Sequence, residues 1–443
     1  MMNEIRICQY MLCLFGVTVL LIGGGVVDRA IAGRGQHAIV TARSTDSLTS
    51  SYSWIQENKS GGSRLREINV IETASPIRSA AFGQYYYILE GGDVNRVTKY
   101  DVLSLDQPIY SYSVVSPGEA GAVTPWDMIF VDDTTAYLLR HDSGMLWVVN
   151  PSAATEDEFL LDTIDLSGFD ESDHIPEMAC GVYLDGKVYI GLQRLENGGA
   201  PGNACIAVID TETHTLVSKE ATGVSGIPLE VVNPFAMAVI EGSQTIYVAG
   251  CGNIDPVFDY TGGIETVDPV TWDTTLLLDD GDASDHPYGC VTGMAVITPE
   301  TAFFTGAAAM DDQTLFTLDL STGTVSEVPF NTTDTTYMTH KKLGGLDGGL
   351  GVDQLNRLWI SNQTDNSVVI VNTTPNAEGK YRTDEEVSFT PDSAGNGMAP
   401  DQIVFCLEDP ITKEETLEKP ASGGESGNFC FIGTLSPCFG WGN

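Results

Sequence analysis

The sequence predicts an all-β protein folded as a seven-bladed β-propeller, and three observations lead to this prediction. Short apolar strands bounded by Gly, Pro, Asp and Asn turns recur about every 50 to 58 residues, which is the spacing of four-stranded propeller blades. After the N-terminal segment, no part of the chain shows the 3.6-residue period of an amphipathic helix. The strands left over at the two ends of the repeat region add up to one further blade.

Each repeat begins with a short apolar strand and continues with a second strand rich in β-branched and aromatic residues. The second strands are the clearest, as in Tyr85–Leu89 and Leu358–Ser361. Third strands often end in Val-Asp or Val-Asn, as in Ala204–Asp210. The first strands of the seven blades are predicted to begin near Pro76, Pro125, Pro176, Pro234, Val291, Gly348 and Pro400.

The two ends of the repeat region predict how the ring closes. After six complete blades the chain supplies one more strand, Gln402–Leu407. Three strands precede the first full blade, at His37–Ala42, Ser50–Gln56 and Arg64–Ile71. Pairing of the last strand with these three would make a seventh blade and remove the exposed edges that an open sheet leaves. We therefore expect one propeller domain over residues 33–407, closed by its N-terminal strands.

Residues 1–32 have the features of an export signal. Arg6 precedes an apolar run from Met11 to Val27, and Ala30-Ile31-Ala32 forms a small-x-small cleavage pattern. A retained anchor is the alternative, although the run is short for a membrane span of ~20 residues. No later segment is apolar over such a length. We expect an extracytoplasmic protein (secreted, periplasmic or on the cell surface) without a transmembrane span after signal cleavage.

Charge narrows the classes of partner. The chain has 21 Lys and Arg against 61 Asp and Glu, a formal net charge of -40. A field of that sign repels nucleic acid and anionic membrane surfaces and attracts cations and basic partners. Nucleic-acid binding is therefore not expected. The ligand, whether a protein or a small molecule, is not identified by the sequence.

The cysteines that follow the signal are odd in number, so at least one is unpaired or bridges to another molecule. No CxxC pattern occurs, which argues against a zinc ribbon and a c-type haem. Cys251 and Cys290 are both expected near one face, and a disulfide between them is predicted. A second predicted pair is Cys430 with Cys438. The seven cysteines are Cys180, Cys205, Cys251, Cys290, Cys406, Cys430 and Cys438.

Propeller topology places scattered polar residues on one face. Interblade loops, and the turns between second and third strands, meet around one mouth of the central channel. Histidines and carboxylates map to these positions, whereas His214 maps to the opposite face. The predicted mouth residues are Asp127, Glu177, His141, His174, His286, His340, Asp347 and Asp401.

One loop at this mouth has the oxygen density that Ca²⁺ requires. It contains Asp279, Asp280, Asp282 and Asp285 but lacks the spacing of an EF-hand. Ca²⁺ is therefore the predicted cofactor. Two alternatives remain open: a His/carboxylate transition-metal or catalytic centre, and solvated turn formers without a ligand. No nucleophile elbow, His-Glu-x-x-His motif or phosphate-binding loop occurs in the chain.

Two phrases of the sequence resemble known propeller repeats. Gly345–Asp353 followed by Asn356–Asn362 is similar to a repeat of SMP-30/gluconolactonase-like and NHL-type propellers, and Ala207–Thr213 is similar to YVTN-type repeats of exported bacterial proteins. Looser versions recur over residues 75–407. The resemblance implies a propeller. The gluconolactonase-like enzymes hold a divalent metal with an acidic residue, two Asn and an Asp, and that set cannot be placed here, so lactonase activity is not carried over.

The tail from residue 408 to residue 443 breaks the repeat pattern. A Gly/Ser-rich stretch leads into Cys430-Phe431-Ile432. This pattern is similar to the processed C-terminal tails of some exported bacterial proteins, and such a tail would allow surface attachment. The alternative is a loop closed by Cys430 and Cys438. Because no coherent catalytic set is visible, we expect a non-enzymatic binding or scaffold propeller with an acidic channel mouth. The alternatives are a metal-dependent, lactonase-like hydrolase and a redox-partner propeller.

Overall fold

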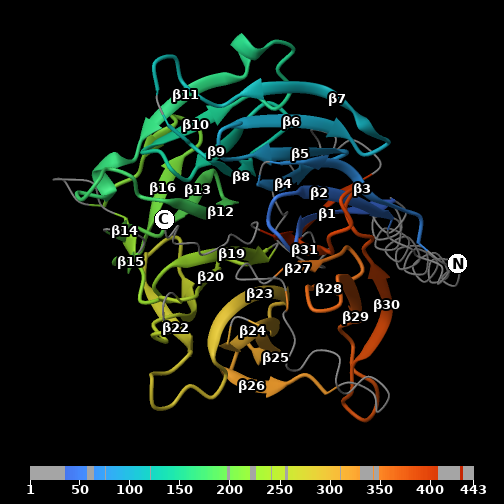
Figure 1. Ribbon diagram of the computed structural model, residues 1–443. Coiled ribbons are helices and arrows are strands. Elements are labelled where there is room, and N and C mark those ends of the chain that lie inside the picture. The colour runs from blue at the N-terminus through green and yellow to red at the C-terminus, as the bar shows by residue number, and fades with distance from the viewer. Residues whose placement is uncertain are drawn as a thin grey trace, which may run out of the picture. The chain divides into compact units, whose positions relative to one another are not determined.

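The structure is a computed structural model, and the part of it described here forms seven β-sheets that follow one another around a ring (Figure 1). Except for Gly35, all of the described residues belong to one compact unit, Gln36–Asn443. The described residues are 35–56, 64–74, 76–119, 121–196, 200–219, 226–240, 242–254, 258–309, 311–329, 343, 349–407 and 430–432. Two short 3₁₀ turns, Glu156–Glu158 and Ser167–Phe169, are the helical elements among them. The predicted all-β propeller is confirmed.

Each blade is an antiparallel sheet whose first strand lies innermost, and blades are numbered here from Ile77 onward. Blade 1 contains β4 (Ile77–Phe82), β5 (Tyr85–Glu90), β6 (Arg96–Asp101) and β7 (Ser104–Ser113). Blade 2 contains β8 (Pro125–Phe130), β9 (Ala136–Arg140), β10 (Met145–Val149) and β11 (Leu160–Asp165). Blade 5 contains β23 (Cys290–Thr298), β24 (Thr301–Ala309), β25 (Asp312–Asp319) and β26 (Thr324–Glu327). Blade 6 contains β27 (Leu350–Val352), β28 (Arg357–Asn362), β29 (Ser367–Asn372) and β30 (Arg382–Ser388).

Blades 3 and 4 carry additional strands. Blade 3 contains β12 (Met178–Leu184), β13 (Lys187–Leu192), β16 (Cys205–Asp210) and β17 (Thr215–Leu216), with β18 (Ile227–Pro228) also paired to β16. Between β13 and β16 the chain forms a separate hairpin of β14 (Leu195–Glu196) and β15 (Ala200–Pro201). Blade 4 contains β19 (Pro234–Ile240), β20 (Ile246–Gly250), β21 (Gly263–Val267) and β22 (Thr274–Asp279), and β32 (Cys430–Ile432) pairs with the free edge of β19.

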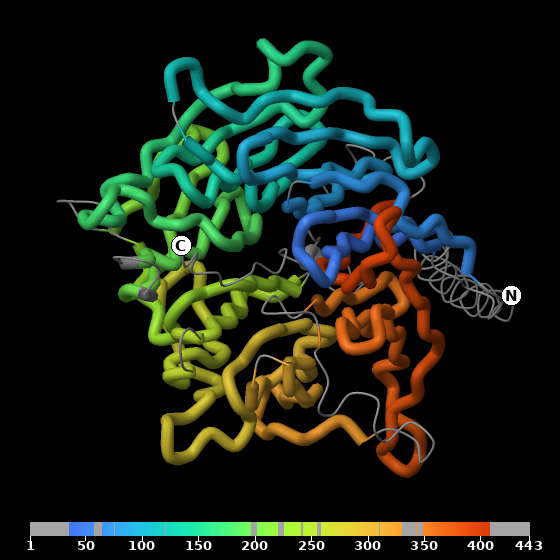
Figure 2. Tube along the Cα trace, viewed as in Figure 1, coloured from blue at the N-terminus to red at the C-terminus, as the bar shows by residue number. Residues whose placement is uncertain are grey.

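Blade 7 joins the two ends of the propeller, as predicted. Its innermost strand is β31 (Met398–Leu407), which pairs antiparallel with β1 (Gln36–Ser44). β2 (Ser50–Gln56) and β3 (Arg66–Thr73) complete the sheet. Figure 2 shows the blue N-terminal strands beside the red last strand. The last strand begins earlier than the predicted Gln402, because the pairing continues past a bulge at Val40/Ala42 to Ser44 and Met398.

The core lies between neighbouring blades, because each sheet presents apolar side chains to the blades on both sides. At the seam between blades 7 and 1, the Tyr52 and Tyr86 rings lie 5.6 Å apart. Both hydroxyls donate to the carbonyl of Leu105, at 2.9 and 2.7 Å. These tyrosines bury large apolar rings while their hydroxyl groups remain hydrogen-bonded, so this seam is packed without an unsatisfied phenol.

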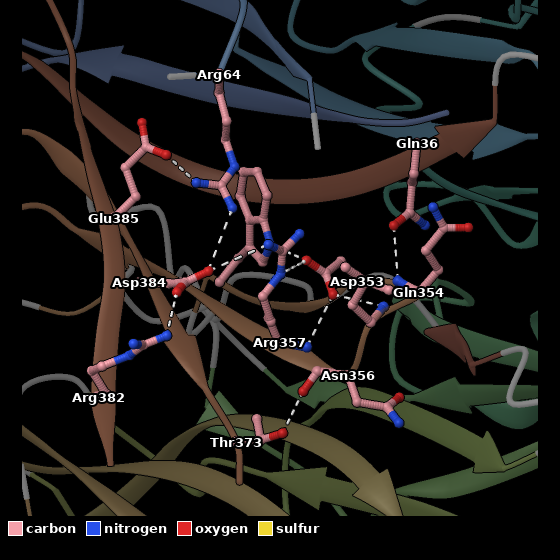
Figure 3. Close-up of polar contacts among 12 residues, drawn as sticks. Gln36, Arg64, Asp353, Gln354, Asn356, Arg357, Thr373, Arg382, Asp384 and Glu385 are labelled. Carbon is pink, nitrogen blue, oxygen red and sulfur yellow. Dashed lines mark hydrogen bonds and ion pairs between the residues drawn. The ribbon is translucent and has the colours of Figure 1, made fainter. Parts of the chain in front are cut away.

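The seam between blades 6 and 7 is held by ion pairs (Figure 3). Arg64, two residues before the start of β3, pairs with Glu385 and lies 3.9 Å from Asp384, both in β30. Its guanidinium also lies 5.5 Å from the centre of the Trp359 ring. The Arg64 side chain is 3% exposed, so this cation has left water and depends on its two carboxylate partners. Arg64 therefore connects the N-terminal strands to the preceding blade.

A second part of the same network explains the phrase that resembles known repeats. Asp353 accepts backbone hydrogen bonds from Leu355 and Arg357, both at 2.9 Å. Its second oxygen accepts from Arg357 Nε at 2.7 Å and from the Trp359 indole at 2.9 Å. All of these donors lie in one turn and strand, so the Val-Asp…Arg-Leu-Trp phrase has a structural role in this blade.

The acidic residues that end third strands also have structural roles. Asp210, Asp268 and Asp319 each accept two backbone N–H groups from the turn that follows, at 2.8 to 3.0 Å. Hydrogen bonding to the charged form lowers the pKa of all three carboxyl groups. These turns lie at the end of the blade opposite the interblade loops, so part of the chain's negative charge serves to form turns.

No helix within the described residues is long and apolar enough to cross a membrane.

The Arg64 ion pairs give a test of ring closure. We expect Arg64→Met to lower the free energy of unfolding by about 1–3 kcal/mol, because Asp384 and Glu385 would lose their buried cation. The control Arg66→Met removes an exposed arginine two residues away and should change stability by less than about 0.5 kcal/mol. Urea denaturation of both variants measures the difference. Equal destabilisation by the two substitutions would contradict the role assigned to Arg64.

Candidate functional site

The residue directly before the innermost strand has a left-handed backbone in five blades. In blades 5 and 6 it is a glycine, Gly289 or Gly349, with φ of 71° and 40°. In blades 2, 3 and 4 it is Thr124, Glu177 or Asn233, with φ of 41°, 45° and 58°. A side chain in this conformation costs roughly 1–2 kcal/mol relative to glycine. Three blades therefore keep side chains at the mouth where glycine would be less strained.

The carbonyl of this residue accepts a backbone hydrogen bond from the end of the second strand in the same blade. Thr124 O accepts from His141 N at 3.0 Å, Glu177 O from Gln193 N at 3.1 Å, and Asn233 O from Cys251 N at 3.2 Å. In blade 1 Pro76 O accepts the equivalent bond from Gly91 N at 2.9 Å, and the proline ring excludes a left-handed backbone there. The bond alone therefore does not require the strain, and the side chains themselves are candidates for function.

Glu177 is the most perturbed of these side chains. The residue is 7% exposed, and its Oε2 accepts the backbone N–H of Leu195, in the β14–β15 hairpin, at 2.8 Å. Burial, together with the charges of Asp173, Asp170 and Asp142, raises the pKa of Glu177 to about 8, against the partial offset of the Leu195 bond. At neutral pH this carboxyl group is mostly protonated, and it can release its proton when a positive charge approaches.

His141 and Asp142 lie beside Glu177, at the end of β9. His141 Nδ1 is 2.8 Å from Asp142 Oδ1, and its Nε2 is 3.1 Å from Gln193 Oε1. Burial alone would raise the pKa of Asp142, but hydrogen bonds from His141 and Thr124 lower it overall. Two neighbouring carboxyl groups therefore have pKa values pushed in opposite directions, an arrangement that favours one charged and one neutral group at the same pH.

A row of side chains connects this site to the blades on either side. The Arg78 guanidinium of blade 1 lies 4.6 Å from the centre of the Trp126 ring of blade 2, and the Trp126 and His141 rings are 4.6 Å apart. Gln193 of blade 3 donates to the carbonyl of Pro234 in blade 4 at 3.3 Å. Contacts across four blades hold His141 in one orientation. The roles of Arg78, Trp126 and Gln193 depend on contacts between blades, which no local pattern in the sequence reveals.

The other predicted mouth residues that the structure describes are not all gathered in one site. Asp127, within β8, is 1% exposed and accepts the N–H of Met128 at 2.6 Å. His174 is exposed in the loop between blades 2 and 3. His286 stacks on Tyr260 at 4.0 Å, beside blade 4. The carbonyl of Asp401 accepts the Ser361 hydroxyl at 3.4 Å. His340 and Asp347 lie outside the described residues.

In the predicted calcium loop, Asp279 and Asp282 form hydrogen bonds within turns, whereas Asp280 is buried. Asp279 accepts the N–H of Gly281 at 2.9 Å, and Asp282 accepts the N–H groups of Ser284 and Asp285 at 2.6 and 3.0 Å. Asp280 instead points inward and is fully buried. Over the described part of the chain, no three or more Asp, Glu, His or Cys residues are arranged to hold a metal ion. Ca²⁺ binding by this loop stays a prediction.

The predicted disulfide between Cys251 and Cys290 is wrong. Cys290 is a free, buried thiol, whereas Cys251 is disulfide-bonded to a different cysteine. The reason is that Cys251 hydrogen-bonds to Asn233 within blade 4, while Cys290 begins β23 and pairs with Ala307 in blade 5. Cys180, Cys205 and Cys406 are also free, buried thiols. The side chains of Cys430 and Cys438 lie outside those described.

The raised pKa of Glu177 gives a pH-dependence prediction. Its folded pKa of about 8 lies above the ordinary value of 4.5, so its contribution to stability is complete below pH 4.5 and is lost as the pH rises through about 8. We expect Glu177→Gln to remove on the order of 2–4 kcal/mol of the fall in unfolding free energy between pH 5 and pH 9.

Glu212→Gln is the control, because Glu212 is exposed in the turn after β16, at the other end of the blade. Chemical denaturation across this pH range measures the slope for wild type and for both variants. An unchanged slope in Glu177→Gln would contradict the assignment of this titration to Glu177.

Neither protein-family models nor curated proteins give a match to the sequence. Among solved structures, a candidate 6-phosphogluconolactonase from Bacteroides uniformis aligns with a TM-score of 0.54 and 10% identity, over 84% of this chain and 99% of that chain. A candidate 6-phosphogluconolactonase from Bacteroides fragilis aligns with a TM-score of 0.51 and 11% identity, over 84% and 98%. At these identities the likeness extends to the fold alone: this chain is a β-propeller.

Proposed function

We propose that this protein is a non-enzymatic binding propeller that receives a positively charged group of its ligand at the mouth, between blades 2 and 3. The observation that carries the proposal is the buried carboxyl group of Glu177, which is 7% exposed and accepts the Leu195 N–H at 2.8 Å. Burial and three neighbouring carboxyl groups raise its pKa to about 8. Such a group lacks a countercharge that a cationic ligand would supply. The net charge of -40 would also attract a basic ligand.

The charged groups around Glu177 favour a cation over an anion. Asp142, Asp170 and Asp173 act on it with negative charge, and Arg194 is the nearby arginine that acts on Asp170. The carbonyl and hydroxyl oxygens of the mouth add further acceptors. A basic peptide side chain or an organic amine would fit this field, since both offer N–H donors and a positive charge. We place this function outside the cytoplasm, on the basis of the N-terminal export pattern, and the tail at 408–443 is the segment that would allow surface attachment.

The second candidate is a metal-dependent hydrolase. A carboxyl group with a pKa near neutrality, beside a histidine, is the arrangement expected of a general acid or base. The same negative field opposes an anionic substrate such as a phosphorylated sugar lactone. Metal analysis of the purified protein separates the two functions, because stoichiometric zinc, iron or copper would favour the hydrolase.

Binding of a cation to ionised Glu177 must release its proton, and this gives a sharp test. We expect the affinity for a hexa-arginine peptide to fall by up to about tenfold per pH unit below pH 8. Glu177→Gln should weaken binding at pH 8.5 at least tenfold and flatten this pH dependence. Isothermal titration calorimetry in two buffers with different ionisation enthalpies measures both the affinity and the proton released.

Two further variants separate site binding from general attraction. Glu212→Gln removes a carboxylate from the other end of blade 3 and should change the affinity by less than about twofold, because exposed charges are screened over about 10 Å. Glu177→Gly should fold at least as stably as wild type, since glycine relieves the left-handed strain, but should lose binding. Equal losses in Glu177→Gln and Glu212→Gln would reduce the proposal to nonspecific charge attraction.

A further inference from the structure

Oxygen atoms surround two glycines at the mouth end of blade 4. A Cβ atom on Gly262 would lie 2.4 Å from the carbonyl of Gly250 and 2.8 Å from Asp280 Oδ2. A Cβ atom on Gly252 would lie 2.8 Å from Asp259 Oδ1 and 2.9 Å from Thr261 Oγ1. Any larger residue at either position would displace these atoms, so the two glycines allow carbonyl, hydroxyl and carboxylate oxygens to converge.

Asp280 is the unusual member of this group. It is fully buried, and neither of its carboxylate oxygens has a hydrogen-bond partner among the described residues. The backbone N–H groups of Gly262 and Val291 lie near enough to favour its charged form without completing a hydrogen bond. A buried carboxylate without partners costs several kcal/mol unless it is protonated or paired with a cation.

The neighbouring groups favour a cation. Burial, together with the negative charges of Asp279 and Asp259, raises the pKa of Asp280 to about 7 against the backbone N–H groups of Val291 and Gly262. Asn233 Oδ1 is another buried acceptor without a partner among the described residues. The charged groups that act on Asp280 are both negative.

We propose that Asp280 binds a hard divalent cation, Ca²⁺, in the space beside Gly252 and Gly262. The Gly250 carbonyl would be a further ligand, with water completing the coordination. Asp259 Oδ1 already accepts the N–H groups of Asn253 and Thr261 at 2.9 and 3.1 Å, so Asp259 would contribute through its charge. Ca²⁺ takes six to eight oxygen ligands and accepts carbonyls and water readily. This site is separate from the Glu177 site and does not depend on it.

The donor atoms argue for a hard ion over zinc. The groups around Gly252 and Gly262 are carbonyl, hydroxyl and carboxylate oxygens, which suit Ca²⁺, whereas zinc in proteins is bound mostly by cysteine and histidine. The proposed site also differs from the calcium loop predicted from the sequence. Asp279 and Asp282 accept hydrogen bonds within their own turns, and of these three residues only Asp280 is buried.

The test uses the full mature protein after EDTA treatment and dialysis, with thermal unfolding followed at pH 7.5. We expect 5 mM CaCl₂ to raise the Tm of wild type by at least ~3 °C, with a smaller effect from MgCl₂. Asp280→Asn should abolish the calcium response, and without calcium it should melt at or above the wild-type temperature, because no buried charge remains. Titration calorimetry should give one Ca²⁺ per chain.

Three controls make the result decisive. Asp282→Asn, an exposed residue in the same loop, should keep the calcium response, and Glu177→Gln should keep it too. Absence of any calcium effect on wild type, or a normal response in Asp280→Asn, would overturn the proposal. Loss of the calcium response in both Asp280→Asn and Asp282→Asn would show that the ion is bound by the loop as a whole. This outcome would contradict a site centred on Asp280. Zn²⁺ binding that is lost on alkylation of Cys290 would also overturn it.

Discussion

The pairing of β31 with β1 is the interaction on which the rest of the structure depends. In this protein the seventh sheet of the ring contains strands from both ends of the repeat region. The two strands are held by backbone hydrogen bonds from Gln36 to Ser44 and by packing on both sides, with the tyrosines of blade 1 on one seam and Trp359 with Arg64 on the other. Once the ring is closed, every innermost strand begins at the same mouth, and this fixes where loop residues can meet.

The acidic residues fall into two groups with opposite electrostatics. Carboxylates at the ends of third strands accept backbone hydrogen bonds, which lower the pKa of Asp210, Asp268 and Asp319. Carboxyl groups near the mouth are buried beside other carboxyl groups, which raises the pKa of Glu177 and Asp280. The first group stabilises turns and is satisfied within the fold. The second group is incompletely satisfied, and the proposed sites for cationic groups both come from it.

The left-handed residues connect the repeat to function. The residue before the innermost strand is a left-handed glycine in blades 5 and 6. Thr124, Glu177 and Asn233 occupy the same position in blades 2, 3 and 4 at a cost in strain. Each of these side chains makes a polar contact: Thr124 with Asp142, Glu177 with Leu195 and Asn233 with Gly252. The strained side chains therefore lie in three consecutive blades, and both proposed sites are in these blades.

The sequence by itself determined the all-β class, the number of blades and the closure by N-terminal strands. Strand periodicity and turn residues are local features, and the strand pattern, which is weak in one blade, becomes clear because it recurs in successive blades. It also led to the prediction that Glu177 and His141 lie near one mouth, and the structure shows that Asp142, next to His141, acts on Glu177. It could not foresee that Cys290 stays free, that Asp280 alone of its loop turns inward, or that Arg78, Trp126 and Gln193 align across blades. These features depend on side-chain contacts between segments far apart in the chain. Only the tertiary structure decided which carboxyl groups are buried together, and burial is what shifts their pKa values.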